Sequence, residues 1–145
     1  MKVYIAMPIN TASGYDPKQM FEEVGHRVTE HGFEAVLPSD DVDPAVWEEW
    51  MRKHLFAECC YMLVESDLEN LKSADAIIAF MPNASIGTAM EIAYARMWSK
   101  KVVVITSLKT FYHPWLWYHA DRVIWSDDPF GEGLDRACRF LRSLR

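Results

Sequence analysis

The 145-residue sequence lacks the features that mark several classes of protein. It has only three cysteines, two of them adjacent, so neither a CxxC metal spacing nor an even disulfide set is available. Basic residues are in deficit, with 15 Lys and Arg against 21 Asp and Glu, which gives a net charge of −6. No apolar run approaches the length of a membrane span, and no signal-peptide pattern is found. We therefore expect a cytoplasmic protein with no metal, whose partners are neither nucleic-acid polymers nor membranes.

What is present is a regular alternation of short apolar runs and amphipathic segments. Runs with the length of buried strands cover residues 3–7, 33–37, 76–81, 101–105 and 122–125. Helical spacing predicts helices over 17–31, in a region after Pro44, and over 63–72, 86–98 and 134–144. Asp16 and Pro17 form an N-cap and first-turn pair for the first of these helices, and Gly32 supplies its stop.

This alternation predicts a single α/β domain over residues 1–145, of Rossmann-like or flavodoxin-like type. Right-handed crossovers would produce a five-stranded parallel sheet with helices on both faces. Ligands of such sheets bind beyond the carboxyl ends of the strands. The segments that follow the predicted strands are therefore the places to search for a site.

The helix predicted over 86–98 begins with features suited to a ligand. Ser85 is a good N-cap, and Gly87 allows a ligand to approach the helix N-terminus. Free backbone N–H groups there favour oxygen-rich or anionic groups. Helical spacing places four apolar residues on one stripe that is predicted to face the core, namely Ile86, Met90, Ala93 and Met97.

Glu91 lies away from that stripe, among small and apolar neighbours. A carboxylate in such surroundings is costly unless it is paired or used, so Glu91 is a candidate catalytic residue. A solvated or ion-paired helix residue is the alternative. Asp67 has the simpler alternative of an N-cap after Ser66.

Four stretches resemble the nucleoside 2-deoxyribosyltransferase superfamily, which includes 2′-deoxynucleoside 5′-phosphate N-hydrolases and cytidylate N-hydrolases. They are YIAMP at 4–8, SDLENLKSADAIIAF at 66–80, SIGTAMEIAYA at 85–95 and KKVVVI at 100–105. The resemblance covers nearly the whole chain and is sharp over 67–105. It implies a small α/β protein without a cofactor, with a nucleotide or nucleoside as its substrate. It also implies a homodimer or higher homo-oligomer with a shared active site.

The resemblance also implies roles for individual residues. Glu91 would be the nucleophile that attacks the anomeric carbon of the sugar. Asp67 would contact the leaving base or assist its protonation. Tyr4 would orient the nucleophile near the 2′ position of the sugar.

The remaining candidates concern substrate binding. Ser85 stands where the phosphate hydrolases carry Ser and the transferases tend to carry Asp, so it favours a 5′-phosphate. Pro8 and Asn10 lie in the loop after the first strand, and Asn10 replaces an Arg that binds phosphate in the hydrolases. His113 falls near a loop that in the hydrolases reaches the neighbouring subunit's site, with aromatic packing as the alternative reading of that segment.

The expected function is hydrolysis of the N-glycosidic bond of a (deoxy)nucleoside 5′-monophosphate, which releases free base and sugar 5-phosphate. Bond cleavage builds oxocarbenium character at the sugar, which a carboxylate can stabilise or trap covalently. One alternative is a nucleoside 2-deoxyribosyltransferase that exchanges bases between deoxynucleosides. The other is a non-catalytic nucleotide-binding module.

Overall fold

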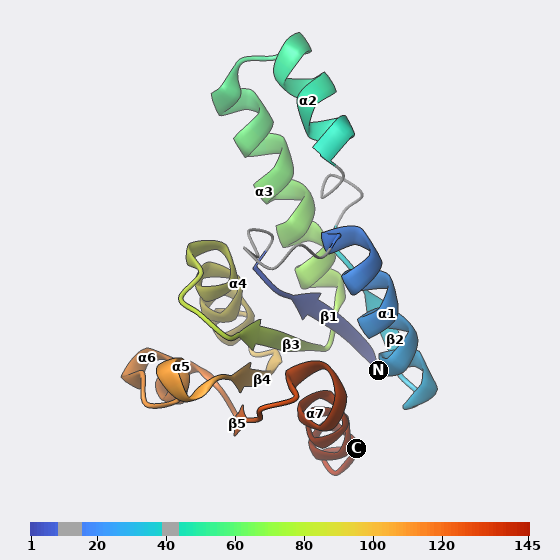
Figure 1. Ribbon diagram of the computed structural model, residues 1–145, viewed down its shortest axis with the longest axis vertical. Coiled ribbons are helices and arrows are strands. Elements are labelled where there is room, and N and C mark those ends of the chain that lie inside the picture. Colours follow the sequence, from blue (N-terminus) through green and yellow to red (C-terminus); the bar gives the residue numbers. More distant parts are fainter. Residues whose placement is uncertain (9–15, 39–43) are drawn as a thin grey trace.

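A computed structural model of the chain describes residues 1–8, 16–38 and 44–145 (Figure 1). Its strands are β1 (Lys2–Ala6), β2 (Glu34–Val36), β3 (Ala76–Met81), β4 (Lys101–Thr106) and β5 (Arg122–Trp125). They form one sheet in the order β2-β1-β3-β4-β5, and every neighbouring pair is parallel. This is the flavodoxin-like order, so the predicted fold class is confirmed.

The helices are α1 (Pro17–Glu30), α2 (Pro44–Lys53), α3 (Phe56–Ser73), α4 (Ile86–Met97), α5 (Leu108–Phe111), α6 (Pro114–His119) and α7 (Leu134–Arg142), the last preceded by a π-helical turn over Pro129–Gly133. The predicted ends of α1 are confirmed. Asp16 accepts the N–H of Lys18 at 3.0 Å, and Gly32 has a φ of 83°. None of the helices in the described ranges combines the length and apolar composition that crossing a bilayer requires.

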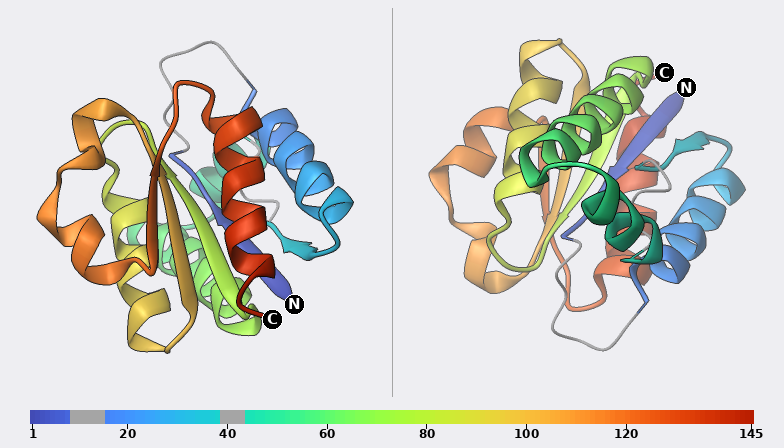
Figure 2. Two further views of the ribbon diagram at one scale, coloured as in Figure 1. Left: turned by 90° about the horizontal axis from the view of Figure 1, so that it is seen from below. Right: turned by 90° about the horizontal axis from the view of Figure 1, so that it is seen from above.

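Two layers of helices cover the sheet, one on each face. Helices α1 and α7 lie side by side on one face, and α3, α4 and α6 contribute to the core on the other (Figure 2). Successive residues of β1 alternate between these faces, because side chains in a strand point to opposite sides. Val3 and Ile5 therefore pack against α1 and α7, whereas Tyr4 and Ala6 belong to the core beneath α3 and α4.

Helix α3 begins several residues earlier than predicted. The sequence pattern placed a helix over 63–72, but α3 runs over Phe56–Ser73. Its N-terminal part forms a helical hairpin with α2 that extends beyond the sheet (Figure 1). Asp67 consequently lies inside α3, and the N-cap interpretation of this residue is wrong.

The predicted core stripe of α4 is also wrong. Ile86, Met90 and Met97 are 87%, 54% and 75% exposed, whereas the face toward the sheet carries Thr88, Ile92 and Ala95. The stripe identified by apolar spacing is thus the outer face of the helix. The inner face includes small residues, which let the helix backbone lie close to the sheet.

Candidate active site

The central contact of the site joins β1 to α4. The Tyr4 hydroxyl donates a hydrogen bond to Oε1 of Glu91 at 2.6 Å. Tyr4 is 0% exposed, because β1 lies between β2 and β3 with helices on both faces. Glu91 lies on α4 between the buried residues Thr88 and Ile92. The contact therefore connects the middle of the sheet to the helix that covers it.

Burial dominates the electrostatics of this pair. Loss of hydration raises the pKa of Glu91 most strongly, the hydrogen bond from Tyr4 lowers it, and the charge of Asp67 raises it. The net result is a pKa of about 7. The pKa of Tyr4 lies far above its ordinary value because of burial and the nearby charges of Glu91 and Asp67. Tyr4 therefore remains a hydrogen-bond donor at all ordinary pH values, while Glu91 titrates near neutrality.

Asp67 completes the group from a third element, α3. Its charge acts on both Tyr4 and Glu91, and one of its carboxylate oxygens is buried. The structure thus brings together the three residues that the resemblance marks as catalytic. Bringing two carboxylates and a phenol close together costs free energy of folding, and active sites often contain such arrangements.

The N-terminus of α4 has the features expected for ligand approach. Ser85 caps the helix by accepting the N–H of Thr88 at 3.4 Å. A Cβ added to Gly87 would meet no protein atom within 4 Å, so space is open beside the backbone there. Because α4 follows β3 and returns antiparallel to it, this N-terminus lies at the carboxyl edge of the sheet, as predicted.

Two hydroxyl groups of the following crossover hold the loop between β3 and α4. Ser107 donates to the carbonyl of Pro82 at 2.6 Å, and Thr110 donates to the carbonyl of Met81 at 2.5 Å. Sequence reasoning missed both residues. They lie in a segment whose structure the pattern did not assign, and which forms the short helices α5 and α6.

The other predicted binding residues are Pro8, Asn10 and His113, which come in addition to the group of Tyr4, Asp67 and Glu91. Pro8 lies two residues after the end of β1 and is half-buried, and Asn10 lies outside the described residues. His113 is exposed at the start of α6.

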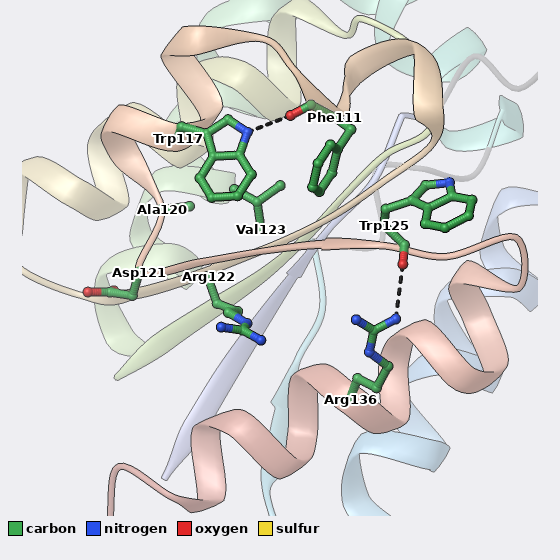
Figure 3. A pocket seen from close by; sticks show the side chains of 8 residues that line it. All are labelled: Phe111, Trp117, Ala120, Asp121, Arg122, Val123, Trp125 and Arg136. Carbon is green, nitrogen blue, oxygen red and sulfur yellow. Dashed lines mark hydrogen bonds between the residues drawn. The ribbon is translucent and has the colours of Figure 1, made fainter.

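A separate hollow of about 510 Å³ opens along the outer edge of β5, between α6 and α7 (Figure 3). Phe111 and Trp117 lie on one side of the strand, and Arg122 and Arg136 on the other. Arg136 donates to the carbonyl of Trp125 at 3.0 Å and so occupies an acceptor of this edge strand. Of the predicted site residues that the structure describes, none lines this hollow.

The described residues contain no group of three or more His, Cys, Asp or Glu side chains placed to hold a metal ion.

Comparison with known proteins shows what the chain is similar to. No protein-family model matches it, and no curated protein sequence matches it. Among solved structures, the Clostridium botulinum CMP N-glycosidase BcmB is similar with a TM-score of 0.61 and 22% identity, over 97% of this chain and 99% of that one. A 2-deoxyribosyltransferase from Bacillus psychrosaccharolyticus is similar with a TM-score of 0.51 and 19% identity, over 73% and 72%.

The same architecture also occurs in a protein of another kind. The response regulator TrrA of Thermotoga maritima is similar with a TM-score of 0.53 and 13% identity, over 95% of this chain and 96% of that one. At such identities the similarity establishes the fold. Function must be argued from the site.

The raised pKa of Glu91 predicts a specific pH dependence of stability. Between about pH 4.5 and 7 the folded chain holds a proton that the unfolded chain has released, so Glu91 makes stability fall as pH rises through this window. In Glu91→Gln this contribution is absent. The unfolding free energy, measured with urea from pH 4.5 to 8, should therefore decline less steeply in the variant than in the wild type.

Glu69→Gln serves as the matched control, because Glu69 is exposed on α3. It should keep the wild-type slope. Parallel curves for the wild type and Glu91→Gln would show that the proton on Glu91 is not linked to folding.

Proposed function

We propose that the chain hydrolyses the N-glycosidic bond of a nucleoside 5′-monophosphate, releasing free base and sugar 5-phosphate. The observation that carries this proposal is the part-buried Tyr4–Glu91 hydrogen bond with the charge of Asp67 beside it. The similarity to a CMP N-glycosidase over nearly the full length of both chains supports the same reaction class.

In the proposed reaction, the Glu91 carboxylate attacks the anomeric carbon and forms a glycosyl ester as the bond to the base breaks. The base leaves with the electron pair of that bond, and Asp67 assists its protonation. A water molecule then attacks the same carbon, loses a proton and releases Glu91. The hydrogen bond from Tyr4 fixes the carboxylate throughout and keeps more of it ionised, because that bond lowers the pKa of Glu91.

The N-terminus of α4 supports a phosphate on the substrate. The contact between Ser85 and the N–H of Thr88 uses the oxygen of Ser85 as acceptor and leaves its hydroxyl hydrogen for a ligand. Backbone N–H groups and the helix dipole favour an anion at the open space beside Gly87. A local arrangement of this kind can bind a phosphate in a chain whose net charge is −6.

Exchange of bases between deoxynucleosides is the second candidate. The similarity to a 2-deoxyribosyltransferase favours it, since the same glycosyl ester can react with a second base in place of water. The carboxylate and phenol serve both reactions, so product analysis has to separate them. A cytoplasmic setting is proposed for either enzyme, and the free state of Cys59, Cys60 and Cys138 supports it.

We also propose that the chain acts as a homodimer whose second copy covers α3 and α4. The exposed face of α4 carries Ile86, Met90 and Met97, and the adjacent α3 exposes Tyr61 and Val64. Apolar surface gathered on two packed helices is characteristic of a protein–protein interface. Because Ile86 adjoins Gly87 at the ligand-binding end of α4, the second copy would complete the entrance to the site.

The main test uses purified wild type and Glu91→Gln with the ribo- and deoxynucleoside 5′-monophosphates and the corresponding nucleosides. Release of free base is followed by liquid chromatography, with and without a second free base. The wild type should release base from monophosphates, and Glu91→Gln should lose activity by about 10³-fold or more because the nucleophile is gone. Glu69→Gln should retain wild-type activity.

A Glu91→Gln variant as active as the wild type would overturn the proposed mechanism. A new nucleoside formed from the added base would establish the transferase instead. Binding without any release of base, seen as thermal stabilisation by nucleotide, would identify a binding module.

The dimer is tested by sedimentation of wild type, Met90→Glu and Leu144→Glu. The wild type should have twice the chain mass of 16.8 kDa, and Met90→Glu should be monomeric with reduced base release, since a charge is placed in the interface. Leu144→Glu is the control, because Leu144 is a partly exposed leucine after α7, on the other face of the sheet. A wild-type monomer, or a Met90→Glu variant that stays dimeric, would contradict this interface.

A further inference from the structure

The hollow along the outer edge of β5 is a feature that the proposed function does not use (Figure 3). Its volume of about 510 Å³ lies in the range of pockets that bind small molecules. Strand β4 separates β5 from β3, the strand that leads into α4 and the candidate active site. A molecule bound in this hollow would therefore occupy a second site.

One side of the hollow is aromatic. Trp117 and Trp125 are 51% and 43% exposed, although tryptophan side chains are highly buried on average. Trp117 is held in place, because its Nε1–H donates to the carbonyl of Phe111 at 2.6 Å. Its ring also meets the Phe111 ring edge to face, with the centroids 5.3 Å apart. Exposed rings that are fixed in this way are suited to stacking on a flat ring of a ligand.

The other side carries two guanidinium groups above helix α7. Arg136 belongs to α7, and Arg122 of β5 lies 5.9 Å from the ring of Phe140, one turn further along that helix. Packing on a ring leaves the N–H donors at the edge of the Arg122 guanidinium available to a ligand. Arg136 lies 3.6 Å from the exposed carboxylate of Glu132, and such surface pairs are weak. Two neighbouring positive charges favour an anion between them.

The acidic residue of the lining does not oppose an anion strongly. One carboxylate oxygen of Asp121 accepts the N–H of Val102 at 2.8 Å. The other lies 3.7 Å from the guanidinium of Arg96. The charge of Asp121 is thus already engaged by groups outside the hollow.

The edge of β5 favours a small molecule over an added peptide strand. An exposed edge strand can pair with another chain through its free N–H and C=O groups. Here Arg136 donates to the carbonyl of Trp125 at 3.0 Å and closes one acceptor of the edge. Strand β5 has four residues, and side chains from the α6 and α7 sides flank it (Figure 3).

We propose that this hollow binds a nucleoside phosphate, with its base on the aromatic side and its phosphate on Arg122 and Arg136. The assignment goes beyond the proposed function, since it adds a second nucleotide site. The strand lies between the rings and the guanidinium groups (Figure 3), so the base and the anion must be separated by roughly the width of a backbone, about 5 Å. A pentose supplies this spacer, whereas a flat acid with its carboxylate on the ring does not. Guanidinium groups bind phosphate oxygens with paired donors.

The backbone offers the sugar a polar partner at the same place. The N–H of Asp121 donates to the carbonyl of Val102 at 2.8 Å and so points toward β4. Successive N–H groups of a strand point to opposite edges, so the N–H of Arg122 points away from β4. It can donate to a sugar hydroxyl or to a phosphate oxygen.

The test counts the nucleotides bound per chain. Glu91→Gln protein is used so that no substrate is consumed, and each of the four ribonucleoside 5′-monophosphates is titrated by calorimetry. The nucleotide that binds most tightly should reach two per chain, one at the N-terminus of α4 and one in the hollow. Adding both Arg122→Gln and Arg136→Gln should remove one of the two. Either change alone should weaken that event about tenfold or more, the worth of a charged hydrogen bond.

Arg52→Gln is the matched control, because it removes the same charge from an exposed position on α2. It should leave both binding events unchanged. Equal weakening by Arg52→Gln and Arg122→Gln would show a general effect of charge and overturn the site.

Partial ligands test the two halves of the site with the arginines in place. The nucleoside without its phosphate, and ribose 5-phosphate without its base, should each bind the hollow at least tenfold more weakly than the nucleotide. Trp125→Leu should weaken the nucleotide but not ribose 5-phosphate. Inorganic phosphate bound as tightly as the nucleotide would overturn the assignment. These comparisons remain decisive if an arginine variant fails to fold.

The possible failures are distinguishable. A number of bound nucleotides that the two arginine changes do not lower overturns the second site, and base release by the wild type then decides the proposed function separately. One nucleotide per chain that the arginine changes abolish, together with no base release by the wild type, supports the second site and overturns the proposed function.

Discussion

The candidate site depends on one interaction between a buried tyrosine and a partly buried carboxylate, the hydrogen bond from Tyr4 to Glu91. A carboxylate placed between a sheet and its covering helix loses its hydration, and the pKa of Glu91 rises to about 7 as a result. Tyr4 offsets part of that penalty, and its own raised pKa keeps it a donor. The proximity of Asp67 adds a further cost, since two carboxylates resist being charged together. The proposed role of Glu91 as a nucleophile would require such an arrangement, since the carboxylate must then be desolvated and correctly placed.

The fold places Tyr4 and Glu91 on elements whose positions are already fixed by strand pairing and helix packing. Strand β1 is paired on both sides, so Tyr4 has a fixed position and direction. The chain changes direction in the sheet at β1 and β3, where ligands of doubly wound sheets bind. Helix α4 starts at that edge, so its N-terminal groups lie there and Glu91 follows about one and a half turns along the helix. The proposed substrate lies along this turn and a half of helix, with its phosphate at the helix N-terminus and its anomeric carbon at Glu91.

Much of this arrangement could be predicted from the sequence. The strands were found because each is a short apolar run between turn residues, and Tyr4, Asp67 and Glu91 were found because they belong to recognisable motifs. The prediction of which side of α4 faces the core was wrong for a physical reason. Apolar spacing identifies the most hydrophobic stripe, and in α4 that stripe of Ile86, Met90 and Met97 faces outward, while the sheet is contacted by a face that includes Thr88 and Ala95. The start of α3 was missed because residues 56–62 are mostly exposed, with Cys59 as the fully buried exception, and so show little of the apolar periodicity that a core imposes. The contribution of Asn10 stays a prediction, since this residue lies outside the described part of the chain.

The pH dependence of catalysis tests the central claim, that Tyr4 holds Glu91 as the ionised nucleophile, most directly. Base release is measured as kcat/KM from pH 5 to 9 for wild type and Tyr4→Phe. The substrate phosphate titrates near pH 6 for both proteins, so the difference between the two curves reports the enzyme. We expect the acidic limb of the wild type near pH 7 and that of Tyr4→Phe at higher pH, because the lost hydrogen bond is the interaction that lowers the pKa of Glu91. Limbs that coincide, or a shift to lower pH in Tyr4→Phe, would contradict it.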